Sequence, residues 1–119
     1  MPHIHMTIGD DVYTVELSAG NDAAADFMAR LPITMHFEDF GANERISYFE
    51  RKLMLGQAPT STAPARGDVC YYSPWGNLAV FVRPFRRSEG LVPLGRMSEA
   101  ALEALRTCSD KPVVFSKAA

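Results

Sequence analysis

Two short apolar runs on either side of a turn constrain this chain most strongly. Residues 69–72 (VCYY) and 78–82 (LAVFV) are rich in β-branched and aromatic side chains, and they flank the sequence SPWGN at residues 73–77. Proline, glycine, asparagine and serine favour tight turns, whereas β-branched and aromatic residues favour strands. The segment therefore predicts a β-hairpin in the middle of a mainly β core.

Alternation of apolar and polar residues predicts further strands along the chain. They are expected at residues 3–8, 12–17, 33–38, 44–50, 92–97 and 111–115. Pro93 places its strand at an edge or at a bulge, because proline cannot donate a backbone hydrogen bond. Residues 56–67 are poor in large apolar side chains and predict a long surface loop.

Two helices are expected between these strands. Asn21 or Asp22 is suited to cap a helix that ends near Arg30, and Ser98 is suited to cap a second helix. About eight strands with two helices predict a closed eight-stranded β-barrel, because closure leaves no exposed strand edges. The helices would then cover the ends of the barrel.

Length and charge limit the classes of function. The chain has 119 residues, enough for one domain over residues 1–119, and a net charge of −2, which gives no general attraction to nucleic acid. No apolar run approaches the ~20 residues of a membrane-spanning helix. The N-terminal residues lack the basic and apolar parts of an export signal, so we expect a cytoplasmic protein without nucleic-acid or membrane partners.

Five local motifs occur along the chain in an order that is similar to the small bacterial and archaeal cyclophilin-like proteins. They are Leu31-Pro32 with Thr34, Phe37-Glu38-Asp39 with Asn43-Glu44-Arg45, Gly67-Asp68 with Tyr72, Pro74-Trp75-Gly76-Asn77, and Pro93-Leu94-Gly95-Arg96. This resemblance covers nearly the whole chain and implies the cyclophilin fold. The family is largely without an assigned activity.

The resemblance also implies two alternative functions. True cyclophilins are peptidyl-prolyl isomerases whose site uses an arginine and a floor of aromatic rings, and here the corresponding candidates are Arg45 and Phe49. The Phe-His-Arg, Gln-Gly-Gly-Asp and Asn-Gly-Ser-Gln-Phe-Phe segments of the isomerases are absent. Weak isomerase activity is therefore one alternative, and a subunit of a larger enzyme assembly is the other.

The polar residues offer weak candidates for a metal site. His3 and His5 share one face of a strand and His36 could add a third zinc ligand, but structural zinc usually has four ligands in compact pairs. His3 and His5 are better suited to the surface at the chain start, and His36 to a polar outer row. Cys70 and Cys108 lack metal-ligand spacing and suit packed thiols. The prediction is no cofactor, no metal site and no assigned catalytic residue.

Aromatic residues supply the best candidate for a binding site. Tyr71 and Tyr72 are neighbours on a strand, so one of them must face outward. Trp75 lies on the turn and either lines an outer groove or plugs a barrel end. We expect a groove outside the barrel that binds a small molecule or an extended peptide, and self-association is left open. The candidate contacts are Thr34, His36, Glu38, Arg45, Phe49, Tyr72, Trp75 and Arg83.

Overall fold

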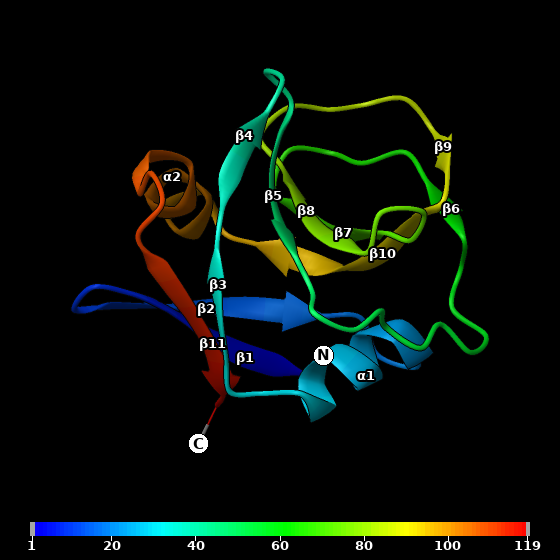
Figure 1. Ribbon diagram of the computed structural model, residues 1–119, viewed down its shortest axis with the longest axis horizontal. Helices are drawn as coiled ribbons and strands as arrows, with labels where there is room; N and C mark the ends of the chain where they lie inside the picture. Colours follow the sequence, from blue (N-terminus) through cyan, green and yellow to red (C-terminus); the bar gives the residue numbers. More distant parts are fainter. Residues whose placement is uncertain (1, 119) are drawn as a thin grey trace.

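The main sheet of the protein curls into a nearly closed β-barrel. The computed structural model describes residues 2–118, and Met1 and Ala119 lie outside the described residues. Nine antiparallel strands follow one another around the barrel in the order β3-β11-β1-β2-β10-β7-β8-β5-β4 (Figure 1). Their bounds are β1 (His3–Ile8), β2 (Asp11–Leu17), β3 (Ile33–His36), β4 (Glu38–Phe40), β5 (Glu44–Tyr48), β7 (Asp68–Tyr72), β8 (Asn77–Phe81), β10 (Leu91–Met97) and β11 (Pro112–Lys117).

The barrel closes through one segment that supplies both edges of the sheet. β3 pairs with β11 and β4 pairs with β5, and only Phe37 separates β3 from β4. The carbonyl of Phe37 accepts a hydrogen bond from the Arg45 side chain at 3.0 Å, so a side chain interrupts the strand there. The strand expected at residues 33–38 is thus two strands, which is why the sheet has nine strands where eight were predicted.

The two predicted helices are present, and each is capped by a side chain. α1 (Asp22–Ala29) begins after Asn21, whose side-chain oxygen accepts from the backbone N–H of Ala24. α2 (Glu99–Thr107) begins after Ser98, whose hydroxyl accepts from the N–H of Ala101. Figure 1 shows the helices on opposite sides of the barrel. Neither helix of residues 2–118 has the length and apolar character needed to cross a membrane.

The interior of the barrel is filled by large apolar side chains. Phe27 of α1 meets Phe115 of β11 and Phe49 edge to face, with ring centroids 5.6 and 5.8 Å apart. Tyr71 is buried in the same cluster, and its hydroxyl accepts a hydrogen bond from the backbone N–H of Leu53. Such packing leaves no room for a ligand inside the barrel, so a site has to lie on its outside.

The surface loop predicted at residues 56–67 is partly structured. It contains β6 (Ser61–Thr62), which pairs with β9 (Ser88–Glu89) in a second, two-stranded sheet, and Ala58 and Pro64 within it are buried. Figure 1 shows β6 and β9 side by side. The bulge expected near Pro93 is also present, because the register of β10 against β7 shifts between Pro93 and Gly95.

Candidate functional site

The outer face of four neighbouring strands carries an apolar cluster of its own. β10, β7, β8 and β5 are adjacent in the sheet, and side chains along each strand alternate between the interior and the outer face. The outward side chains that are nonetheless buried are Ile46, Cys70, Ala79, Phe81 and Leu91. Burial on the outside of a barrel requires a second layer of chain over the sheet.

Residues 83–90, which connect β8 to β10, form this second layer, called here the cover. The ring of Phe85 stacks on Phe81 with centroids 5.8 Å apart, and the guanidinium of Arg86 lies 4.7 Å from the centroid of Phe85. The N–H of Phe85 donates to the carbonyl of Pro64, and that of Gly90 donates to Thr60. The loop at residues 56–67 therefore holds the cover against the outer face.

A groove of about 350 Å³ lies beside the cover on this outer face. This volume falls in the range of ~300–1,000 Å³ that is common for small-molecule sites. Its lining comes from the hairpin of β4 and β5, the turn between β7 and β8, the cover and the start of β10. The lining residues are Phe40, Glu44, Ile46, Tyr72, Trp75, Asn77, Phe85, Arg86, Ser88, Glu89 and Leu91.

Three aromatic rings form one wall of this groove. Trp75 meets Phe40 edge to face with centroids 5.3 Å apart, and it meets Tyr72 edge to face at 5.6 Å. Trp75 is 49% exposed and Phe40 is 45% exposed. This is unusual, because large aromatic side chains bury much apolar area when they are covered. The wall thus presents aromatic surface to solvent, where a flat molecule can stack.

Asn77 is the most unusual polar residue of the groove. It is 1% exposed, and its Oδ1 is buried without a hydrogen-bond partner among residues 2–118. A buried polar atom without a partner costs free energy, and most such atoms in native proteins are paired. A buried side-chain oxygen without a partner on the lining of a groove is a candidate contact for a ligand.

Glu44 adds an ionisable group to the same groove. Burial raises the pKa of the Glu44 carboxyl above its ordinary value of 4.5, because the ionised form loses hydration. None of the ion pairs found among residues 2–118 includes Glu44. The groove therefore offers a carboxylate whose charge is not neutralised by a cationic partner.

A family model matches residues 6–116 and describes a cyclophilin-like family. The chain belongs to the cyclophilin-like family. The resemblance seen in the sequence motifs is thereby confirmed. No curated protein matches the chain.

One solved structure shares the fold of this cyclophilin-like chain over nearly its whole length. It is the solution structure of a hypothetical protein from Archaeoglobus fulgidus, with a TM-score of 0.66 and 18% sequence identity. The match covers 98% of this chain and 95% of the other. At this level of identity, the similarity concerns the fold alone.

The structure brings two of the eight sequence-predicted contacts into the groove. Tyr72 and Trp75 line it together, as expected for an outward tyrosine, while Tyr71 faces the interior. Trp75 lies against Phe40 and Tyr72 and is half exposed, so it lines the groove and does not plug the barrel.

The other six predicted contacts lie elsewhere. Thr34 and His36 are exposed on β3, where the Nδ1 atom of His36 lies 3.0 Å from the carbonyl oxygen of Asp110. Glu38 and Arg83 are exposed and do not line the groove. Phe49 packs into the interior against Phe27.

Arg45, the residue proposed to correspond to the isomerase arginine, is buried and faces away from the groove. Its guanidinium donates to the carbonyl oxygens of Phe37, Leu105 and Ser109 at 3.0, 2.9 and 2.8 Å. Its Nε donates to the carboxylate of Asp39 at 2.9 Å. Arg45 therefore joins the strand break at Phe37 to the end of α2, which is a structural position in the barrel.

Sequence reasoning missed most of the groove. Phe40 and Glu44 lie on either side of a turn, at the ends of two short strands, and Asn77 follows a turn, where asparagine is a common turn residue. Phe85 reaches the groove only because residues 83–90 fold back over the sheet, a long-range contact that no local pattern encodes. The alternation of side chains along β5 could have identified one of these residues. If Ile46 faces outward, Glu44 must also face outward and Arg45 must face the interior.

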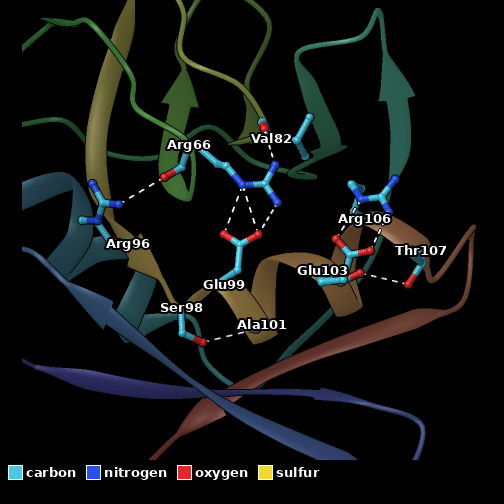
Figure 2. Close-up of polar contacts among 9 residues, drawn as sticks. All are labelled: Arg66, Val82, Arg96, Ser98, Glu99, Ala101, Glu103, Arg106 and Thr107. Carbon is cyan, nitrogen blue, oxygen red and sulfur yellow. Dashed lines mark hydrogen bonds and ion pairs between the residues drawn. The ribbon is translucent and has the colours of Figure 1, made fainter.

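A second cluster of charged residues lies at the start of α2, where Figure 2 shows its contacts. Arg66 binds the carboxylate of Glu99 and donates to the carbonyl of Val82 at 2.6 Å. This contact lowers the pKa of the Glu99 carboxyl, chiefly through the hydrogen bond from Arg66. Arg96 pairs with Asp68 at 2.8 Å. These charges are paired with one another and anchor the loop at residues 56–67 to α2.

The thiols and imidazoles form no metal site among the described residues. Residues 2–118 contain no group of three His, Cys, Asp or Glu side chains placed to hold a metal ion. Cys70 and Cys108 are both buried and unbridged, as predicted for packed thiols. Burial raises the pKa of the Cys70 thiol to about 12, so it stays protonated near neutral pH and is a poor nucleophile.

Proposed function

We propose that this cyclophilin-like protein binds a small ligand or an extended peptide in the groove on the outside of its barrel. The observation that carries the proposal is the exposed aromatic wall of Phe40, Tyr72 and Trp75 beside a volume of about 350 Å³. Aromatic rings kept partly in solvent next to a concave surface are typical of binding sites. Glu44 and Asn77 supply the few polar groups that orient a ligand in such a site.

The wall is held in place by the fold. Trp75 is carried by the turn between two fully paired strands, and the N–H groups of Trp75 and Gly76 both donate to the carbonyl of Tyr72. Gly76 has a φ of +71°, a conformation that favours glycine in the last position of this turn. A rigid turn below an exposed ring reduces the entropy lost when a ligand stacks on it.

The isomerase alternative has less support. The arginine of an isomerase has to face the prolyl peptide, and all the hydrogen bonds of Arg45 go to the barrel and to the end of α2. A protease-coupled assay with a prolyl peptide separates the alternatives, because acceleration at micromolar protein would favour the isomerase. The alternative of a subunit in a larger assembly stays a prediction, and the size of the protein in solution tests it.

Binding of the dye 8-anilinonaphthalene-1-sulfonate tests the proposed groove. The dye carries a flat naphthalene ring, and its emission rises when it leaves water. Trp75→Ala removes one stacking partner and is expected to weaken dye binding about threefold to tenfold, since such ring contacts contribute ~0.5–1.5 kcal/mol.

The matched control is Met54→Ala, which removes another exposed apolar side chain, 74% exposed, that does not line the groove. It should leave dye affinity unchanged. Equal losses in the two variants, or none with Trp75→Ala in a folded protein, would contradict the proposed groove.

A further inference from the structure

The side-chain amide of Asn77 indicates which chemical class the groove selects. Asn77 begins β8, directly after the turn that carries Trp75, and its outward side chain lines the groove. It is 1% exposed, and no hydrogen bond of its Oδ1 is found among residues 2–118. The site thus keeps a buried polar group without the partner that such groups normally have.

An asparagine amide is planar and presents an acceptor and a donor side by side. Rotation of the amide by 180° exchanges its oxygen and nitrogen, so both functions remain in either rotamer. The complement of such an edge is another amide, whose N–H donates to the oxygen while its C=O accepts from the nitrogen. Aromatic carboxamides and lactams carry such an N–H donor and C=O acceptor side by side, in or near the plane of a flat ring.

The residues around Asn77 favour a planar ligand that carries such an amide. Tyr72 is its cross-strand neighbour on β7, and the ring of Tyr72 meets that of Trp75 edge to face. Ile46 and Leu91 add apolar lining to the same groove. A planar amide can therefore pair its edge with Asn77 and place its rings against the aromatic wall.

The sheet topology leaves no backbone edge at Asn77 for an extended peptide. A peptide that adds to a sheet needs a free strand edge. Asn77 lies on β8, which is already paired on both sides by β5 and β7, so it offers a ligand its side chain. The volume of about 350 Å³ suits a small molecule.

We infer that the groove binds a small planar molecule with an amide edge, which pairs with the side chain of Asn77 and stacks on the wall formed by Phe40, Tyr72 and Trp75. The inference rests on the proposed function and specifies its ligand class. Because Asn77 is 1% exposed, the ligand reaches its amide only when neighbouring side chains of the groove move aside.

A pair of matched probes tests the inference in the full-length protein. Benzamide carries the amide edge on a flat ring, and methyl benzoate has a similar shape but no N–H donor. Titrations followed by ¹H–¹⁵N NMR are expected to give at least tenfold tighter binding of benzamide, with shifts of residues that line the groove. Equal affinity for the two probes would overturn the amide assignment and leave the proposed groove standing.

Variants then test whether Asn77 is the partner. Asn77→Leu replaces the amide by an apolar group of similar branching, and it is expected to reduce the preference for benzamide to about one while methyl benzoate still binds. The matched control Asn43→Leu makes the same change outside the groove lining and should keep the tenfold preference. A preference that survives Asn77→Leu would overturn the role of Asn77.

Two further outcomes separate this inference from the proposed function. A capped tripeptide, N-acetyl-Ala-Phe-Ala-amide, that binds in the groove more tightly than benzamide would overturn the small-molecule class and support a peptide ligand. Absence of shifts in the groove with all three probes would contradict the proposed function itself. If Asn77→Leu fails to fold, the preference of the unmodified protein for benzamide over methyl benzoate still tests whether the groove selects an amide.

Discussion

The two faces of the neighbouring strands β5 and β8 each bury a polar side chain, but the two side chains differ in their hydrogen bonds. Arg45 of β5 faces the interior, where three backbone carbonyl oxygens and the Asp39 carboxylate accept its hydrogen bonds. Asn77 of β8 faces outward into the groove, and its Oδ1 has no partner among the described residues. The chain itself completes the polar contacts of Arg45 in the interior, whereas on the outer face we propose that another molecule completes those of Asn77.

The aromatic residues show the same difference. Inside the barrel, Phe27 and Phe115 are almost fully buried and meet edge to face. On the outer face, Phe40 and Trp75 also meet edge to face but remain about half exposed. Rings that remain half exposed at a solvent-facing groove bury less apolar area and so contribute less to folding.

The largest expected effect comes from truncating rings on the two faces. Phe27→Ala should destabilise the protein by about 3–5 kcal/mol, because it leaves a cavity in a packed interior. Phe85→Ala should cost about 1–2 kcal/mol, because Phe85 is only half buried over the outer cluster. Urea denaturation measures the loss of stability in each variant. Equal losses for Phe27→Ala and Phe85→Ala would show that the cover belongs to the core as fully as the barrel interior does.

Arg45→Met tests the interior polar contact. The variant keeps an apolar stem of similar length but removes the donors for Phe37, Leu105 and Ser109, so we expect a loss of about 3 kcal/mol. The control Arg106→Met removes an exposed ion pair with Glu103, which solvent screens, so it should change stability far less. A loss for Arg45→Met no larger than the control would refute the structural role given to this arginine.

Asn77→Leu should raise the stability of the protein, whereas Arg45→Met should lower it. Removing a buried amide without a partner relieves a desolvation cost, and we expect a gain of about 1 kcal/mol in the free energy of unfolding. The urea midpoint of the variant, compared with that of Asn43→Leu, measures this gain. A clear loss of stability would mean that the Asn77 side chain is already satisfied in the free protein.

Glu44→Gln is expected to have the smallest effect, and it depends on pH. The pKa of Glu44 is raised in the folded protein, so the folded state holds its proton more tightly than the unfolded state does. The Glu44 contribution to stability therefore falls as pH rises from about 4.5 through the raised pKa. The variant should be slightly more stable than the parent at pH 7 and equal to it at low pH, as thermal denaturation at several pH values can measure. A constant difference across this range would contradict the assigned burial of Glu44.

Much of the fold could be predicted from local patterns. Strand alternation and the caps at Asn21 and Ser98 are encoded by neighbouring residues, and the structure contains the strands and helices that they predicted. The division of the third strand could not be predicted, because it depends on Arg45 reaching Phe37 from another strand. Tyr72 could be predicted because a strand cannot bury two adjacent tyrosines on one side, and Trp75 because it lies on the turn.

The rest of the groove depends on which way each strand faces and on how the connection after β8 folds. The resemblance to the isomerases suggests Arg45 as an outward contact, yet alternation along β5 places its side chain in the interior, where it is 5% exposed. Asn77 is a typical turn residue, and the sequence does not show that its side chain is enclosed. Both placements depend on tertiary contacts, which local alternation leaves open.

The most direct test of the difference between the two faces is the side-chain NH₂ signal of Asn77 in ¹H–¹⁵N spectra, assigned by its absence in Asn77→Leu. On titration with benzamide, we expect a downfield shift of one of its protons and slower exchange with water, because the amide gains a hydrogen-bond partner. An Asn77 signal that stays unchanged while benzamide saturates the groove would contradict the claim that the outer face keeps this amide for a ligand.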